Sequence, residues 1–265
     1  MTSNLDLNKS EQYKLSIRLS TDGFSFAVCN YQTGNAIFSR NWAVNSRRSL
    51  AANVKSFLAE NQELTGKFKH TSVLIDTLRY TTLPLEHYED DQTEMLFYQN
   101  LPKKDNENIL CNILGESNLV ILFSIDKLTH QFIIDNFPEA RIFVAVSPQV
   151  ESFAGRCKQE QSNILFANLH PETTDLLCFR QGKLQTVNSY KTSTAEDRCY
   201  FIAGLWNLLN YDSQKDELHI VGETKFIDSV SDILKDMVKN ISKTAVTDDD
   251  LAFDLQALLN CERQS

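Results

Sequence analysis

The sequence contains little glycine. Only 8 of its 265 residues are glycine, and no two of them are adjacent, whereas an average chain has about 7%. Loops that hold phosphate through backbone N–H groups usually need clustered glycines, because glycine tolerates positive φ and lets the backbone approach the ligand. The composition therefore gives no support to a glycine-rich phosphate loop.

Basic residues are also few. Lys and Arg total 26 against 35 Asp and Glu, which gives a formal net charge of −9. The basic doublets are Arg47-Arg48 and Lys103-Lys104. Because nucleic-acid binding needs a cationic surface that displaces counterions, we predict no nucleic-acid partner.

Long apolar runs and a leader segment are missing as well. Stretches such as Leu119–Phe123 are too short to span a bilayer, and the opening MTSNLDLNKSEQ has no apolar core of a signal peptide. The closing segment carries Asp248, Asp249 and Asp250, which anionic lipid would repel. We therefore expect a cytoplasmic protein without membrane insertion, whose last helix (Leu251–Leu259) completes the second half of the chain.

The six cysteines and five histidines form no metal-binding pattern. The cysteines are widely separated without a C-x-x-C pair, and the histidines show no H-E-x-x-H spacing. Most cysteines lie inside apolar runs, which is typical of buried free thiols in a reducing compartment. We predict no metal site.

What the chain does contain is an internal repeat. Each half reads as three strands, a helix, a strand, a helix, a strand and a helix. In the first half these are Tyr13–Ser20, Phe24–Asn30, Ala36–Val44, Leu50–Leu58, Ser72–Asp76, Lys127–Asp135, Arg141–Val146 and Pro148–Lys158. In the second half they are Asn163–Leu169, Thr174–Phe179, Leu184–Tyr190, Asp197–Asn210, Leu218–Val221, Thr224–Lys239, Ile241–Val246 and Leu251–Leu259. This order predicts a duplicated α/β domain with one mixed five-stranded sheet in each lobe, 1–158 and 159–265.

One segment, residues 77–126, has no counterpart in the second half. It contains an acidic helix near Asp90–Gln99 and two strands, Ile109–Leu114 and Leu119–Ser124, joined by Gly115-Glu116-Ser117. An unstructured loop of this length would be unusual. The segment therefore predicts a small inserted α+β subdomain in the first lobe.

The duplicated order resembles the actin-like ATPase superfamily, which has a duplicated ribonuclease H-like fold. The position of the insertion resembles the branch that serves pilus assembly and cell division. The resemblance implies an ATP site between the lobes, and its motifs fall on degenerate positions. The first phosphate motif falls on Thr21-Asp22-Gly23, with Thr21 at the position of the magnesium-linked acid unless Asp22 substitutes one position later. The adenosine motif falls on Gly222-Glu223, with one glycine of two.

The second phosphate motif is the most altered. It falls on Asn168, Leu169, His170, Pro171, Glu172, Thr173, Thr174 and Asp175. The T-T-D end survives, whereas Asn168 replaces the first acid and every glycine is lost. Pro171 removes a backbone donor, and Glu172 adds a carboxylate where phosphate would lie.

These departures favour a catalytically inactive scaffold with no cofactor and no catalytic residue. An ATP-binding protein or enzyme that uses Asp22, Asp175, Glu172 or Glu223 around a metal is the alternative. A third hypothesis is an oligomerising structural protein, but the sequence alone does not separate an exposed apolar stripe from the core.

If the nucleotide site is lost, we expect function to reside in the insertion. Met95, Leu96, Phe97 and Tyr98 follow an acidic helix start, and Ile109–Leu114 could offer a strand edge. The alternative is that these four side chains only pack the subdomain. The sequence thus predicts a protein or peptide partner, with a basic one favoured by the acidic helix.

Overall fold

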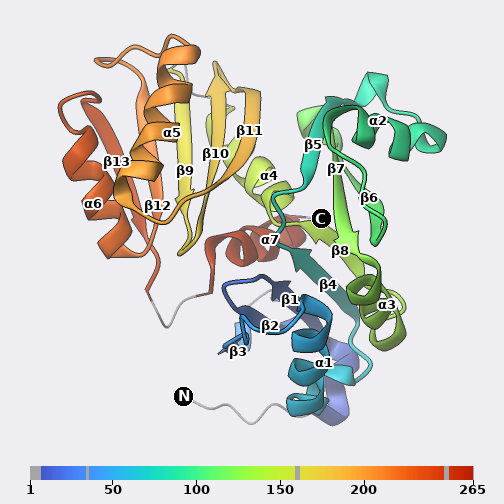
Figure 1. Cartoon of the computed structure of the whole chain (residues 1–265). Coiled ribbons are helices and arrows are strands. Elements are labelled where there is room, and N and C mark those ends of the chain that lie inside the picture. The colour runs from blue at the N-terminus through green and yellow to red at the C-terminus, as the bar shows by residue number, and fades with distance from the viewer. Residues whose placement is uncertain (1–6, 34–35, 159–161, 248–250, 265) are drawn as a thin grey trace. The chain divides into compact units, whose positions relative to one another are not determined.

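A computed structural model describes residues 7–33, 36–158, 162–247 and 251–264, so Asp248–Asp250 lie outside the described residues. The chain has a mixed α/β fold with two five-stranded sheets and a third sheet of three strands (Figure 1). It divides into two compact units. Unit 1 comprises Met1–Pro148 and Asp254–Ser265, and unit 2 comprises Gln149–Phe253.

The sheet of unit 1 has the strand order β3-β2-β1-β4-β8. Its strands are β1 (Tyr13–Leu19), β2 (Phe24–Asn30), β3 (Ala36–Trp42), β4 (His70–Ile75) and β8 (Arg141–Val144). Strands β1 to β3 pair antiparallel, whereas β4 pairs parallel with both β1 and β8.

Two helices cover one face of this sheet, α1 (Leu50–Glu60) and α3 (Lys127–Asn136). Ser49 caps α1 by accepting from the Ala52 N–H, and Asp126 caps α3 in the same way. Ile17 and Leu19 point from β1 toward Phe57 and Ile133. Because side chains alternate along a strand, Arg18 points to the opposite face.

The insertion forms the predicted small subdomain within unit 1. Its sheet has the order β5-β7-β6, with β5 at Tyr80–Pro84, β6 at Glu107–Leu114 and β7 at Leu119–Asp126. Helix α2 (Thr93–Asn100) packs on it through the buried Phe97, which contacts Val120 and Leu122. Strand β5 was not predicted, because its YTTLP sequence is polar and ends in proline, as suits an edge strand.

Unit 2 repeats the topology of unit 1. Its sheet has the order β11-β10-β9-β12-β13, with strands β9 (Ile164–Leu169), β10 (Thr173–Arg180), β11 (Lys183–Lys191), β12 (Glu217–Gly222) and β13 (Asn240–Ala245). Gln181 and Gly182 both have positive φ and turn β10 into β11, as predicted. The duplicated α/β fold is confirmed.

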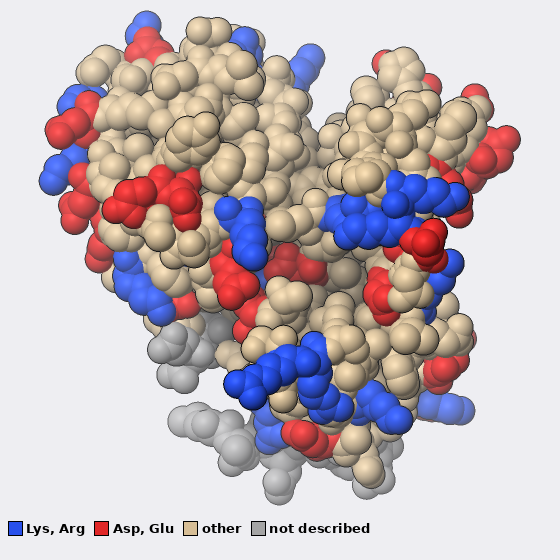
Figure 2. Space-filling view, in the orientation of Figure 1, with Lys and Arg blue, Asp and Glu red and all other residues tan. Residues whose placement is uncertain are grey.

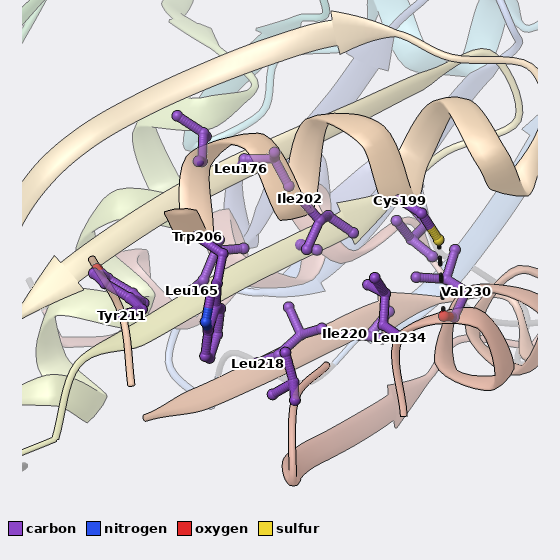
Figure 3. Packing of buried hydrophobic residues seen from close by; sticks show 14 of the residues in the cluster. Leu165, Leu176, Cys199, Ile202, Trp206, Tyr211, Leu218, Ile220, Val230 and Leu234 are labelled. Atoms are coloured by element: carbon purple, nitrogen blue, oxygen red, sulfur yellow. Dashed lines mark hydrogen bonds between the residues drawn. The ribbon is translucent and has the colours of Figure 1, made fainter. Parts of the chain in front are cut away.

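The core of unit 2 lies between its sheet and two helices, α5 (Ala195–Leu208) and α6 (Thr224–Leu234). Figure 3 shows Trp206 and Ile202 of α5 pointing at the strand residues Leu165 and Leu218. A capping box between Thr194 and Asp197 fixes the start of α5. The buried side chains of α5 that contact this core, Cys199, Ile202, Leu205 and Trp206, lie on one face of the helix.

Short 3-10 helices complete the fold at Leu7–Gln12, Gln62–Thr65, Leu85–His87, Asp90–Gln92 and Gly115–Ser117. Helix α4 (Val146–Cys157) contains the boundary between the units, ten residues before the boundary expected from the sequence at residue 158. None of the described helices is long and apolar enough to cross a membrane.

The closing helix α7 (Phe253–Gln264) requires a correction. We expected it to complete the second lobe, but its residues from Asp254 onward belong to unit 1. Asp254 and Leu255 are fully buried, and the Asp254 carboxylate meets the buried Arg18 of β1. The ion pair explains why α7 belongs to unit 1. A buried arginine needs anionic partners, and Asp254 of α7 supplies one that the strands of the sheet do not.

Candidate functional site

The first motif position lies in the turn between β1 and β2. Thr21 is exposed, whereas Asp22 and Gly23 are half-buried. The Asp22 carboxylate accepts a hydrogen bond of 3.0 Å from Nη1 of Arg18. Asp22 is therefore already paired with a cation from the preceding strand.

Arg18 holds two further carboxylates. Its Nη2 donates to Asp76 at the end of β4 at 3.0 Å, and its Nε donates to Asp254 of α7 at 2.7 Å. Burial of the guanidinium opposes its charge, but the three carboxylates raise the pKa of Arg18 well above its ordinary value. Among the described residues, no group of three or more His, Cys, Asp or Glu side chains is placed to hold a metal ion.

The second motif forms the end of β9, a short loop and the start of β10. Pro171 and Glu172 are exposed in the loop, while His170 is buried beside them. The His170 N–H donates to the Thr173 carbonyl at 2.9 Å, and the Glu172 carbonyl accepts from the Thr192 N–H at 2.9 Å. The loop is thus closed by hydrogen bonds within unit 2.

Arg198 of α5 binds the other side of this loop. Its Nη2 donates to the carbonyl oxygens of His170 at 2.9 Å and Pro171 at 3.2 Å. The guanidinium carbon also lies 4.4 Å from the centre of the Phe226 ring. Burial lowers the pKa of Arg198. Sequence reasoning missed this residue, because it lies inside an apolar helix far from the motif.

Asp175, the surviving acid of the motif, is buried in a polar network. Its Oδ2 accepts from Gln149 at 2.8 Å and lies 3.2 Å from Nε2 of His170. Asn168 donates to the Gln149 side chain at 3.2 Å. Burial alone would raise the pKa of Asp175, but its bonds to His170, Ser189 and Gln149 lower it. Thr174 is tied to Thr192 by a hydroxyl contact of 2.9 Å.

Gly222 and Glu223, the positions of the adenosine motif, follow β12. Gly222 has a φ of +147°, and a Cβ at this position would lie 2.8 Å from the Leu169 carbonyl oxygen. The fold itself therefore requires this glycine. Glu223 precedes α6 without capping it through its side chain, and it forms an ion pair with Lys225 at 2.5 Å.

The four apolar residues of the insertion differ in exposure. Phe97 is fully buried, Leu96 and Tyr98 pack against the subdomain core, and Met95 is 52% exposed. Packing of the subdomain therefore accounts for three of the four. Met95 alone of these remains available to a partner.

Strand β6 lies at the edge of its sheet, and the described strands pair with it only through β7. Because antiparallel pairs alternate, Ile109, Cys111 and Ile113 direct their backbone groups away from β7. The Cys111 carbonyl accepts a hydrogen bond of 3.1 Å from the Asn112 side chain. A depression of about 500 Å³ runs beside Ile109–Cys111 and is also lined by Asp90, Thr93, His130 and Ile142.

Asn112 fixes this edge relative to the main sheet of unit 1. Its side-chain amide donates to the Ile142 carbonyl at 2.9 Å and accepts from the Val144 N–H at 2.9 Å. The side chain therefore occupies the free edge of β8 as a short strand would.

Comparison with known proteins places the chain in a family. Residues 2–241 match the family described as protein of unknown function (DUF3822). A search of curated proteins finds no significant match. A protein of unknown function with an actin-like ATPase fold from Bacteroides thetaiotaomicron is similar over 98% of this chain and 100% of its own, with 35% identity and a TM-score of 0.88.

More distant structures share the fold. The PilM-PilN type IV pilus biogenesis complex matches 95% of this chain and 99% of the other with 11% identity and a TM-score of 0.57. The ethanolamine utilization protein EutJ from Carboxydothermus hydrogenoformans matches 96% and 90% with 13% identity and a TM-score of 0.51. The resemblance to the actin-like ATPase superfamily is confirmed, and the chain belongs to the DUF3822 family of proteins of unknown function.

Proposed function

We propose that this protein is a catalytically inactive member of its fold that binds a protein partner. The observation that carries the proposal is the pair of hydrogen bonds from Arg198 to the carbonyl oxygens of His170 and Pro171. A phosphate loop directs N–H groups at its anion. Here the loop directs carbonyl oxygens at a cation of the same chain.

The remaining groups of this loop also argue against a nucleotide. The His170 N–H is used by Thr173, and Pro171 has no N–H. The Glu172 carboxylate is exposed at the same loop, and like charges a few ångströms apart repel by about 1–4 kcal/mol in water and near a protein surface. Nucleotide binding would have to overcome both effects.

The hairpin of unit 1 argues against a bound metal. A magnesium ion prefers carboxylate oxygens, but Asp22 and Asp76 are both bonded to Arg18. The guanidinium is a permanent cation that no pH change removes under ordinary conditions. These residues therefore do not fit a magnesium-nucleotide complex.

For the partner, the inserted subdomain offers the best-supported surface. The edge of β6 directs backbone groups outward, and an extended segment could add to it as a further strand. The exposed acids Glu86, Asp90, Asp91 and Glu94 lie on the neighbouring short helices and α2, and the exposed Glu89 directly precedes the second short helix. PilM, which shares the fold, is known in a complex with PilN. We infer that a basic extended segment is the partner.

A labelled synthetic peptide of alternating lysine and valine tests this assignment by fluorescence anisotropy, with an aspartate–valine peptide as the control. Ile113→Pro removes an outward N–H of β6 and leaves the pairing with β7 in place. We expect the lysine peptide to bind the native chain and to bind the variant at least tenfold more weakly. Equal binding by both chains, or no binding by either, overturns the assignment to β6.

A further inference from the structure

The sequence between Asp22 and Glu60 contains no acidic residue, so all 35 Asp and Glu residues of this acidic chain lie outside it. The same segment carries four basic residues, which are named the basic surface here: Arg40, Arg47, Arg48 and Lys55. They lie on β3, on the loop after β3 and on α1, and all four are exposed. Figure 2 shows basic side chains gathered over α1 and the strands beside it. Unit 1 of this acidic chain therefore carries a local region of positive charge.

None of these four cations forms an ion pair with a carboxylate of the described residues. Nη1 of Arg48 donates to the Ser56 hydroxyl at 2.8 Å, and Nη1 of Arg40 donates to the Asn61 side chain at 3.2 Å. Both acceptors are neutral, so they orient the guanidinium groups without cancelling their charge. Because a guanidinium has five N–H donors, both arginines keep donors for a further anion.

The loop that carries Arg47 and Arg48 is held by the buried Asn53 of α1. The Asn53 side chain accepts from the Asn45 N–H at 2.8 Å and donates to the carbonyl oxygens of Asn45 and Ser49, each at 3.1 Å. The Arg47 N–H in turn donates to the Asn45 side chain at 3.0 Å. The backbone beneath the two arginines is therefore ordered before any partner arrives, which lowers the entropic cost of binding.

The acids that border the basic surface have partners of their own. Glu60, at the end of α1, accepts a hydrogen bond of 2.8 Å from Nε1 of Trp42. Asp135 lies on α3, which packs beside α1, and it accepts from Gln131 of its own helix at 2.7 Å. Asp22, which precedes the segment, is bonded to Arg18. These carboxylates therefore leave the charge of the basic surface uncompensated.

We propose that the basic surface binds a short acidic segment of a protein partner. Three of its four cations are arginines, whose planar guanidinium groups bind carboxylates through paired N–H···O bonds. At physiological ionic strength, charges more than about 8 Å apart are largely screened. A short segment therefore responds to these four cations rather than to the net charge of the whole chain. The surface is separate from the edge of β6, where the proposed partner is basic.

A membrane or a nucleic acid fits the basic surface less well than a protein segment does. The exposed large apolar side chains of the described residues all lie outside residues 36–60. The surface thus has charge but no apolar group to insert into lipid, whereas stable membrane attachment takes two signals. A DNA duplex carries phosphates along its whole length and would extend past the four cations onto a chain with a net charge of −9. A short acidic segment avoids both costs.

The labelled aspartate–valine peptide of the β6 experiment is the probe, and fluorescence anisotropy measures its binding to the full chain. A variant with Arg47→Glu and Arg48→Glu reverses two exposed charges of the basic surface. The matched control combines Lys103→Glu with Lys104→Glu, because this changes the net charge equally at the other exposed basic doublet. We expect the arginine variant to bind the peptide at least tenfold more weakly than the native chain, and the lysine variant to bind it like the native chain.

Lys55→Glu gives an independent test, since the exposed Lys55 lies on α1 and takes no part in the loop contacts. It should also weaken binding of the aspartate–valine peptide, while urea denaturation shows an intact fold. Equal weakening by the arginine and lysine doublet variants, no binding by the native chain, or tighter binding of a DNA duplex or anionic vesicles overturns the proposal. Ile113→Pro should leave this peptide's binding unchanged, so failure here is distinct from failure of the proposed function.

Discussion

Nε of Arg18 donates to the Asp254 carboxylate at 2.7 Å, across 236 positions of the sequence, and both residues are buried. This bond joins the first strand to the last helix. It also leaves Nη1 and Nη2 of the same guanidinium to bind Asp22 and Asp76.

The first prediction follows from this arrangement. Arg18→Met should lower the free energy of unfolding by about 3–5 kcal/mol, because it leaves the buried Asp254 carboxylate without its cation and also removes the partner of the half-buried Asp22 and Asp76. Urea denaturation of the full chain measures the change. Arg40→Met is the control, since Arg40 is exposed and bonds only the Asn61 side chain in the described contacts of its guanidinium nitrogens. If Arg18→Met and Arg40→Met lower the free energy of unfolding by the same small amount, the Arg18 ion pairs do not stabilise unit 1.

The second prediction concerns pH. The pKa of Asp175 is lowered in the folded state, so the carboxylate contributes stability above its ordinary pKa of about 3.9, and this contribution is lost as pH falls through the folded-state value. Asp175→Asn should be less stable at neutral pH and should lose less stability below about pH 4. Thermal melts at several pH values compare the two chains. Parallel losses in both would show that another group controls the acid response.

A third prediction contrasts two glycines of unit 2. Gly222→Ala should destabilise the protein by about 1–3 kcal/mol, because its positive φ and the close Leu169 carbonyl both oppose a side chain. Gly204→Ala should stabilise it by about 0.5–1 kcal/mol, since α5 has open space at that position. Urea denaturation at one protein concentration measures both. Stability changes of opposite sign would support a strained backbone at Gly222 and open space at Gly204. Changes of the same sign would contradict this difference.

Strand and helix periodicity predicted most of the fold. The three-strand runs at Tyr13–Val44 and Asn163–Tyr190 and the Gln181-Gly182 turn all match the structure, because local pattern and turn chemistry determine them. Strand β5 was missed because threonine and proline weaken its local signal. This strand forms because it pairs antiparallel with β7, a contact that the local sequence does not reveal.

The candidate site could be predicted only in part. Motif positions identified the loop at Pro171 and the acid Asp175, but not the two arginines that bond to the motif residues. Arg18 lies within an apolar strand and Arg198 follows two acids at the start of an apolar helix, so neither arginine stands out in the sequence as a ligand of the motif. Their partners come from distant positions in the chain, and only the folded arrangement brings them together. For the same reason, the sequence did not show that α7 packs in unit 1, where Asp254 pairs with Arg18.

The central claim is that this fold has lost its nucleotide site, and the most direct test is calorimetric titration of the full chain with ATP and magnesium. We expect no binding tighter than the millimolar range, both for the native chain and for a variant that combines Pro171→Gly with Glu172→Gly. The variant restores loop glycines but leaves Arg18 bonded to Asp22 and Arg198 bonded to the loop. Micromolar affinity of the native chain for ATP and magnesium would contradict the account.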